Sequence, residues 1–427
     1  MAAHCFDATT FVGPCNHKAR GQHHNPPAPG RSHYLKIKRK QVCNKFFIGM
    51  KRIHTILIIL LLAVTYGEAK KSSDDRQMDD FITSLMKKMT LEEKIGQLNL
   101  GGVGSPKVVG SAIGLDEAIR KGLVSSVGGF DAKAAEDAQK FAVENSRMKI
   151  PLITGLDVVH GYYTIFPIPL ASACSWNMPL LEESARVAAD EASAFGINWT
   201  FAPMVDICRD PRWGRIAEGA GEDPCLGSRI GRAMVRGFQG DDLSKPNTLL
   251  ACVKHFALYG ASEAGRDYNT VSMDPVTMYN YYLPPYKAAF DEGAGSGMTS
   301  FNVVNGVPAT GNKWLLTDLL RDQWKFKGFM VSDANSLAEM SEHGMGGAQR
   351  ITELAMNAGL DMDMSSSLYV LCLKKAVEEK RVPLSRIDAA CRRVLEAKYK
   401  LGLFEDPFRY LKNKQRQSQV LSPQNRD

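Results

Sequence analysis

The sequence lacks several signatures that are common in enzymes, and each absence excludes a class of site. It contains neither a Gly-x-Gly-x-x-Gly fingerprint nor a Gly-x-x-x-x-Gly-Lys-Ser/Thr loop, so nucleotide binding has no support. Its nine cysteines form no Cys-x-x-Cys pair, so no zinc site is indicated. The acidic segment that opens at Asp361 has Ser366 and Cys372 where a calcium loop requires Gly and Glu, which excludes that kind of metal site.

The chain also lacks net charge outside its first 49 residues. Residues 1–49 hold eight lysines and arginines against one acidic residue, Asp7, and so account for the whole formal charge of +7. A neutral remainder gives no reason to expect a nucleic-acid partner. We infer that Met50 is the true start and that residues 1–49 are upstream sequence or disordered; a basic arm that binds nucleic acid is the alternative.

Residues 50–69 have the layout of a secretory signal peptide. A basic start at residues 50–52 precedes the apolar run Ile56–Val64 and a small-x-small cleavage site at residues 67–69. The apolar run is much shorter than the roughly 20 residues of a membrane span, so no stable span is expected after cleavage. The segment therefore predicts a periplasmic or secreted protein.

A folded domain is expected over residues 75–410, followed by a polar tail over residues 411–427. The Thr90–Glu93 segment is a capping box that starts a helix. Helical patterns such as Leu181–Phe195 and Trp314–Trp324 alternate with short apolar segments of strand character. These segments are Val124–Phe130, Pro151–Val159, Asn198–Ile207, Leu249–Leu258, Gly297–Val304, Phe329–Asp333 and Leu360–Met364. The alternation predicts an α/β fold, either a (β/α)8 barrel or a doubly wound sheet.

Polar residues near the ends of these segments favour the barrel. A barrel places the carboxyl ends of all its strands around one pocket, whereas a doubly wound sheet concentrates its polar groups at one switch point. The expected ring consists of Asp157, Asp206, Lys254 with His255, Asn302, Asp333 and Asp361.

Individually, these residues leave their roles open. Arg215 lies in a loop rich in Gly and Pro, where it either clamps a polar ligand or belongs to a solvated ion-pair surface. Lys254 and His255 are adjacent, so both face one pocket only if their strand ends or bulges there. Asp157 is equally ambiguous alone.

Taken together, six segments resemble the first domain of the family-3 glycoside hydrolases, especially the periplasmic β-glucosidases. The resemblance covers about residues 75–410, and its order and spacing are highly specific. The matching segments are residues 155–161 (Gly-Leu-Asp-Val-Val-His-Gly), 209–215 (Arg-Asp-Pro-Arg-Trp-Gly-Arg), 254–256 (Lys-His-Phe), 266–269 (Arg-Asp-Tyr-Asn), 298–302 (Met-Thr-Ser-Phe-Asn) with 305–306 (Asn-Gly), and 327–333 (Lys-Gly-Phe-Met-Val-Ser-Asp).

The resemblance implies a (β/α)8-like barrel and assigns Asp333 as the nucleophile of a retaining mechanism. It implies that the sugar hydroxyls are held by Asp157, Arg215, Lys254 and His255, and that Met298 and Phe301 shape the pocket. Carboxylates accept hydrogen bonds from hydroxyls while Arg, Lys and His donate them, so these residue types suit a neutral sugar. No metal or organic cofactor is needed for this chemistry, and the expected partner is a β-linked oligosaccharide or glycoside.

The chain departs from the family pattern in three places. In the β-glucosidase branch the acid/base Glu comes from a second, sandwich-type domain, which residues after Pro407 are too few to form. The N-acetylhexosaminidase branch carries an Asp/His pair after its Lys-His, but the loop 257–268 has no His. Many relatives have Trp after the nucleophile, where this chain has Ala334.

The resulting hypothesis is a retaining β-glucosidase that is impaired as a 427-residue chain because the acid/base domain is missing. One alternative is a sugar-binding or inactive barrel. Another is a β-N-acetylhexosaminidase or β-xylosidase of the same family.

Overall fold

Two parallel sheets and one antiparallel pair contain the strands of the part of the chain that is described. The computed structural model describes residues 73–102, 114–128, 132–412 and 414–426. The expected upstream segment 1–49 and signal peptide 50–69 lie outside these residues. In the described part no helix is long and apolar enough to cross a membrane.

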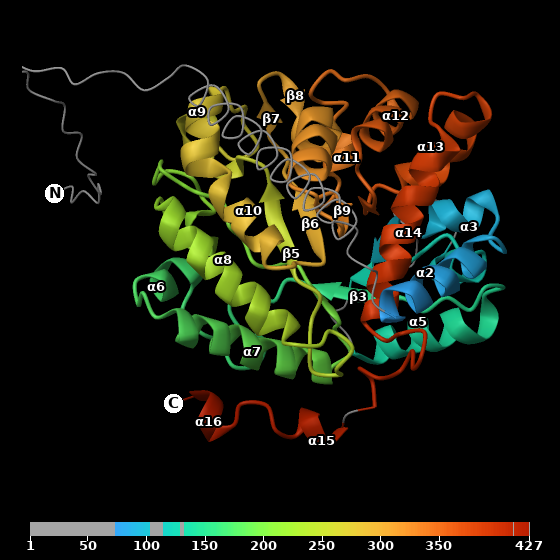
Figure 1. Ribbon diagram of the computed structural model, residues 1–427, viewed down its shortest axis with the longest axis horizontal. Coiled ribbons are helices and arrows are strands. Elements are labelled where there is room, and N and C mark those ends of the chain that lie inside the picture. The colour runs from blue at the N-terminus through green and yellow to red at the C-terminus, as the bar shows by residue number, and fades with distance from the viewer. Residues whose placement is uncertain (1–72, 103–113, 129–131, 413, 427) are drawn as a thin grey trace, which may run out of the picture. The chain divides into compact units, whose positions relative to one another are not determined.

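The first sheet has the strand order β10-β1-β2-β3-β4, the second has the order β5-β6-β9, and β7 pairs with β8 antiparallel (Figure 1). The strands are β1 Asn99–Gly102, β2 Ser126–Gly128, β3 Ile153–Leu156, β4 Trp199–Thr200, β5 Cys252–Phe256, β6 Ser296–Thr299, β7 Val303–Val304, β8 Val307–Pro308, β9 Phe329–Val331 and β10 Asp363–Met364. All neighbours within the two larger sheets pair in parallel.

Isolated parallel bridges join the edges of the two sheets. One links Trp199 of β4 with Leu250, just before β5, and another links Val331 of β9 with Met362, just before β10. The fold is therefore α/β with parallel sheets, which confirms the predicted class.

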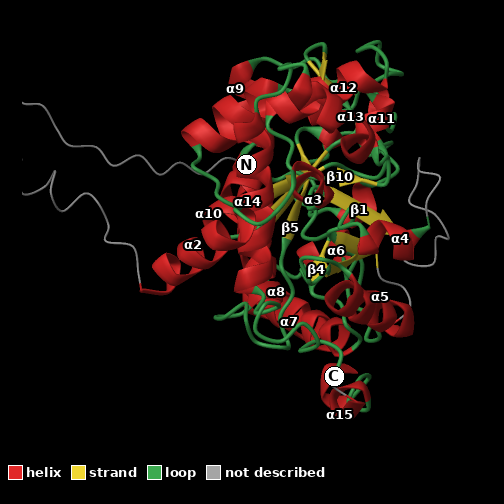
Figure 2. Ribbon diagram, turned by 90° about the vertical axis from the view of Figure 1, so that its right-hand side faces the viewer, coloured by secondary structure: helices red, strands yellow, loops and turns green. Residues whose placement is uncertain are grey.

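Helices connect and surround these strands, and Figure 2 shows the strands in the interior of the described unit. The α-helices are α2 Ser73–Met86, α3 Leu91–Gly96, α4 Leu115–Arg120, α5 Ala132–Asn145, α6 Pro169–Ala173, α7 Met178–Ala194, α8 Pro224–Gln239, α9 Pro275–Thr277, α10 Pro284–Asp291, α11 Ser336–Glu339, α12 Ala348–Ala358, α13 Leu368–Glu378, α14 Leu384–Lys400, α15 Lys414–Gln417 and α16 Pro423–Arg426. Short 3-10 turns are η1 Ile216–Glu218, η2 Tyr259–Ala261, η3 Glu263–Gly265 and η5 Ala309–Gly311, and the wider π-helical turns are η4 Met278–Tyr282 and η6 Trp314–Gln323.

The capping box and the helical patterns predicted from the sequence are present in the structure. The Thr90 hydroxyl accepts a hydrogen bond from the backbone N–H of Glu93, and the Glu93 carboxylate accepts one from the backbone N–H of Thr90, at 3.2 and 2.8 Å. The predicted capping box at α3 is thus confirmed. The helical pattern at residues 181–195 corresponds to α7, and that at 314–324 to η6.

Each predicted apolar segment contains a strand or part of one, but β1 and β8 were not predicted. The sequence of β1, Asn-Leu-Gly-Gly, has only one large apolar side chain, and β8 has only two residues, so neither strand has a readable period. The predicted position of Asp361 at the end of a strand is also wrong, because this residue precedes β10. Its carboxylate binds Arg321 and Arg393, each at 2.6 Å, so it forms a buried ion-pair cluster away from the expected ring.

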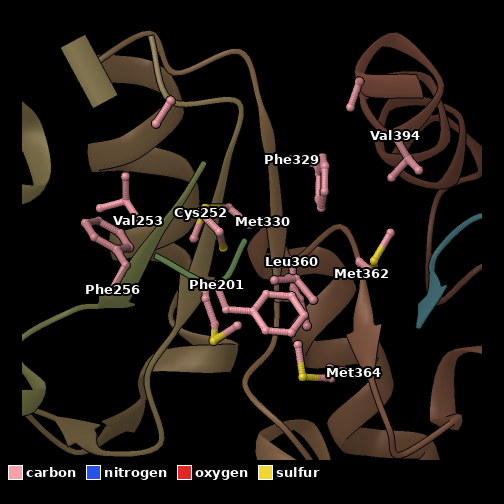
Figure 3. Packing of buried hydrophobic residues seen from close by; sticks show 14 of the residues in the cluster. Phe201, Cys252, Val253, Phe256, Phe329, Met330, Leu360, Met362, Met364 and Val394 are labelled. Carbon is pink, nitrogen blue, oxygen red and sulfur yellow. The ribbon is translucent and has the colours of Figure 1, made fainter. Parts of the chain in front are cut away.

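The core lies between the strands, where side chains from both sheets meet. Figure 3 shows Phe201, Phe329 and Leu360 in this interior, with methionines 362 and 364 beside them. The buried Trp199 ring lies 4.8 Å from Phe201 and 5.2 Å from Phe329 between centroids. Its indole N–H donates to the hydroxyl of Ser296 at 2.8 Å, so β4, β6 and β9 share one packed interior.

One buried lysine of this framework, Lys398, forms no ion pair with a carboxylate among the described residues. Lys398 on α14 has no exposed surface, and its Nζ donates to Gln97 Oε1 at 2.7 Å. Burial lowers the pKa of Lys398 to about 7, because removal from water penalises the charged form. The unfolded chain therefore binds a proton that the folded chain does not, over the window between about pH 7 and the ordinary lysine value.

We predict that Lys398→Met removes this pH dependence. The free energy of unfolding of the wild-type chain should rise by about 2 kcal/mol more than that of the variant between pH 7.5 and 9, because each pH unit in this window contributes about 1.4 kcal/mol per proton. Urea unfolding at the two pH values measures the difference. Lys400→Met, on the same helix but exposed, should behave like the wild type. An equal pH response in all three chains would contradict the prediction.

Candidate functional site

Asp333 lies two residues beyond β9, where the buried strand reaches the surface. The strand is held at its end by Ser332, whose backbone N–H donates to Met362 O and whose hydroxyl accepts from Met364 N, both at 2.9 Å. The Asp333 side chain is 14% exposed. Its Oδ1 accepts from the backbone N–H of Ala334 at 2.7 Å, while its buried Oδ2 has no hydrogen-bond partner among the described residues. One carboxylate oxygen is thus oriented and the other is available.

Lys254 and His255 both reach the site because β5 is irregular at its end. The register of β5 against β6 shifts between Val253 and Phe256. The Nζ of Lys254 contacts Asp157, while the imidazole of His255 lies 3.5 Å from Asp333 Oδ2. The bulge that the adjacent pair requires is therefore present.

The imidazole of His255 is oriented by Asp206, which follows β4. Asp206 Oδ2 accepts from the backbone N–H of His255 at 2.8 Å and lies 2.9 Å from its Nδ1. Asp206 Oδ1 accepts from the hydroxyl of Tyr286 on α10 at 2.5 Å. Both His255 and Asp206 are almost completely buried, so this carboxylate holds the ring in one position.

Arg215 contacts the other ring nitrogen. Its Nη2 lies 3.2 Å from His255 Nε2, and a guanidinium has only donors, so Nε2 accepts and the imidazole proton is on Nδ1. Glu218 on η1 binds Arg215 with both carboxylate oxygens, at 2.7 and 2.8 Å. Burial alone would lower the pKa of Arg215, but the hydrogen bonds and charge of Glu218 raise it. Arg215 thus stays charged and fixed beside the imidazole.

Asp157 and Lys254 form an ion pair at the end of β3. The distance between Lys254 Nζ and Asp157 Oδ1 is 2.5 Å. The lysine side chain is buried, whereas that of Asp157 is 59% exposed, so the carboxylate presents its second oxygen to solvent. A hydroxyl of a bound ligand can donate to that oxygen.

Aromatic side chains pack beside the imidazole. The ring of Tyr259 lies 5.4 Å from that of His255, 5.2 Å from that of Trp213 and 5.8 Å from that of Phe301. The predicted residue Phe301 is therefore part of the wall next to the polar cluster. Met298 is buried in β6, where it pairs in register with Val331 of β9.

The structure thus brings five of the predicted residues into one connected cluster: Asp157 with Lys254, and Arg215 with His255 and Asp333. Asp206 belongs to the predicted ring of strand-end residues, although no role was assigned to it, and three further polar groups nearby, Glu218, Tyr268 and Glu339, were not predicted as site residues. Asp206 carries a sequence signal, since it stands near a strand end, but nothing in the sequence distinguishes Glu218 from the other charged residues of its loop.

The charge of Asp333 also affects the pKa of Glu339 on α11. Burial raises the pKa of the Glu339 carboxyl, and the negative charge of Asp333 raises it further. For Glu218, burial alone would raise the pKa, but hydrogen bonds from Arg215 and its positive charge lower it. The pKa values of two glutamates near the site are therefore shifted in opposite directions, downward for Glu218 and upward for Glu339.

Other features of the described residues lie away from this cluster. A cavity of about 780 Å³ lies between α6, α7 and residues 421–426, and none of the predicted site residues lines it. Cavity size alone is no guide to chemistry, and this cavity lacks the converging charged groups around Asp333. The described part of the chain also contains no group of three or more His, Cys, Asp or Glu side chains placed to hold a metal ion.

Comparisons with known proteins identify the family of the chain. Residues 90–397 match the model of the glycosyl hydrolase family 3 N terminal domain. A periplasmic beta-glucosidase of Salmonella typhimurium is 43% identical over 339 residues, which are 78% of this chain and 43% of that protein. A putative beta-xylosidase of Formosa agariphila is 32% identical over 368 residues, which are 81% of this chain and 48% of that protein.

A comparison with solved structures finds the same family. A crystal structure of the beta-glucosidase from Listeria innocua in complex with isofagomine has a TM-score of 0.77 and 42% sequence identity, covering 81% of this chain and 49% of that chain. The chain spans about half the length of the curated relatives that it matches.

We predict that Asp206→Asn destabilises the fold by about 1–3 kcal/mol. The carboxylate accepts hydrogen bonds from buried donors, whereas the amide would turn an N–H₂ group, itself a donor, toward them. Chemical denaturation measures the change, and nitrogen NMR of the imidazole reports whether the proton leaves Nδ1. Asp322→Asn, an exposed position on η6, is the matched control. Equal stability of the two variants would be inconsistent with the orienting role of Asp206.

Proposed function

Because the chain belongs to glycosyl hydrolase family 3 and contains its N-terminal domain, we propose that it hydrolyses terminal non-reducing β-D-glucosyl residues. Asp333 is the nucleophile of a retaining double displacement. The observation that carries this proposal is the buried Oδ2 of Asp333, which has no hydrogen-bond partner among the described residues and lies beside His255, whose Nε2 also contacts Arg215.

We also propose that the two parallel sheets form one closed (β/α)8-like barrel. The bridges Trp199–Leu250 and Val331–Met362 support closure, since they join the edge strands of the two sheets. The contacts of Trp199 with Phe329 and Ser296 support a shared interior. In such a barrel the residues after the strands surround one pocket, which matches the positions of Asp157, Asp206 and Asp333.

In the proposed complex, the exposed oxygen of Asp157 accepts from sugar hydroxyls, while Lys254, Arg215 and His255 line the same pocket as donors or acceptors. Met298 and Phe301 give the pocket its apolar side. Each charged donor already has a fixed carboxylate partner, so the pocket is organised before the sugar enters.

The reaction follows in two steps. Asp333 Oδ2 attacks the anomeric carbon and forms a glycosyl ester, while the bond to the leaving oxygen breaks and that oxygen takes up a proton. Water then attacks the anomeric carbon, loses a proton, and releases the sugar with its original configuration and a free Asp333 carboxylate.

The sugar is proposed as glucose because the relative named a beta-glucosidase is 43% identical, against 32% for the putative beta-xylosidase. β-Xylosidase and β-N-acetylhexosaminidase activities are the alternatives within the family. The three sugars differ in the substituents of the ring, so comparison of the aryl β-glycosides of glucose, xylose and N-acetylglucosamine separates them. A periplasmic or secreted location is proposed from the signal-like segment 50–69 and from the printed name of the Salmonella relative.

We predict that Asp333→Asn abolishes labelling by a fluorosugar inactivator of the glucose series, with a fall in rate of about 10³-fold or more, because an amide does not form the glycosyl ester. Mass spectrometry of the intact chain measures the covalent adduct. Asp322→Asn should label like the wild type. Undiminished labelling of the Asp333→Asn chain would remove Asp333 from the role of nucleophile.

Turnover by the 427-residue chain should depend steeply on the leaving group. From the family resemblance we expect the proton donor in a part of the relatives that this chain does not match. An activated aryl glucoside has a leaving group that needs little protonation, so it should give a rapid burst followed by slow turnover. Alkyl glucosides and cellobiose have poor leaving groups. They should react about 10²- to 10⁴-fold more slowly with this chain than with an enzyme that positions a general acid beside the leaving oxygen. Ready hydrolysis of cellobiose that is lost in Glu339→Gln would contradict this and assign the proton donor to Glu339.

A further inference from the structure

Tyr268 is an exposed aromatic residue for which neither the core nor the proposed chemistry has a use. Its side chain is 49% exposed, and its backbone φ of +65° lies in the left-handed region that a bulky residue rarely adopts. A single exposed ring is ordinary on a protein surface. A strained backbone that holds such a ring beside a reactive group is a reason to ask what the ring contacts.

The loop that carries Tyr268 is anchored on both sides. The carboxylate of Asp267 accepts from the indole N–H of Trp213 at 2.9 Å. After the tyrosine, the side-chain amide of Asn269 donates to Glu263 O at 3.1 Å, and Val271 N donates to Val303 O at 2.7 Å. The ring is thus presented on fixed backbone.

Ring contacts lead from Tyr268 to the nucleophile. The Tyr268 ring lies 4.7 Å from Phe301 and 6.3 Å from Tyr259, and the Tyr259 ring lies 5.4 Å from His255. His255 in turn lies 3.5 Å from Asp333. Among the exposed aromatic side chains in the described part of the chain, Tyr268 is the one that packs on this cluster.

Several charged groups of the site act on the Tyr268 phenol. Burial raises the pKa of the Tyr268 phenol, and the negative charges of Asp267, Glu339 and Asp333 raise it further, while Arg215 opposes them. Asp267 precedes the tyrosine in the chain, Glu339 ends α11 and Asp333 follows β9. The ring borders the outer, solvent side of the site.

The residue that follows the nucleophile offers no such surface. Ala334 is exposed and has only a methyl group, and Asn335 beside it is polar and exposed. A flat apolar partner for a leaving group therefore has to come from another segment. Tyr268 has the exposure, the rigidity and the position for this task.

We infer that Tyr268 forms the aromatic wall of the leaving-group subsite and favours glycosides whose leaving group has a flat apolar face, an inference that rests on the proposed glucosidase function. Rings prefer offset or edge contacts with a partner ring, and such pairs strengthen binding by about 2- to 10-fold beyond area burial. The subsite is expected to discriminate between an aryl and a methyl leaving group attached to the same sugar.

The test is isothermal titration of the 427-residue chain with methyl and phenyl thio-β-D-glucosides, which resist hydrolysis. The wild type should bind the phenyl compound about 2- to 10-fold more tightly than the methyl compound. Tyr268→Ala should remove this preference while leaving the Kd of the methyl compound unchanged, and Tyr268→Phe should retain the preference. Tyr279→Ala, which removes a tyrosine of similar exposure (43%) on η4, is the matched control.

Each other outcome overturns the inference. A phenyl preference that survives in Tyr268→Ala excludes the ring as its source, and equal weakening of both compounds in that variant indicates a structural role. Wild-type binding of both compounds with equal Kd also overturns the inference but leaves the proposed function standing, whereas binding of neither compound contradicts the sugar pocket itself.

Discussion

The carboxylate of Asp206 is the group on which the site depends. It is buried, and it accepts hydrogen bonds from the backbone and side chain of His255 and from the hydroxyl of Tyr286. A buried carboxylate without such donors would be strongly unfavourable, so these bonds fix the end of β5 in one arrangement. That arrangement turns Nε2 of His255 toward Arg215 and Asp333, and it sends Lys254 toward Asp157.

Beside these paired charges, the buried Oδ2 of Asp333 has no hydrogen-bond partner among the described residues. Glu218 holds Arg215 and Asp157 holds Lys254, while one oxygen of Asp333 is bound by the adjacent backbone N–H. Oδ2 of Asp333 is the oxygen that remains. A site built this way is rigid on its inner side, where side chains are buried, and open toward Tyr268 and Asp157, which are exposed. Such a division suits a ligand that enters from solvent and is recognised by fixed donors and acceptors.

How far the sequence predicts this structure depends on the kind of contact. The α/β class and seven of the strands follow from apolar segments that alternate with helical patterns, because burial of strands and helix faces imposes a local period. The short glycine-containing strand β1 has no such period, and the position of Asp361 at the start of β10 depends on register that periodicity does not report. The sequence does not single out Glu218 and Tyr268 for a related reason. One is charged and the other is aromatic, and many charged and aromatic residues have no role in a site.

By itself, the sequence determined the α/β class, the family resemblance and the positions at which Asp157, Lys254, His255 and Asp333 follow apolar segments. These features are local, since each is written in consecutive residues. Only the tertiary structure decided that Lys254 and His255 both reach the site, that Asp206 orients the imidazole, and that Tyr268 packs on Phe301 beside the site. Those relations join residues up to about a hundred positions apart, and they depend on a bulge, a strand register and the packing of side chains from different elements.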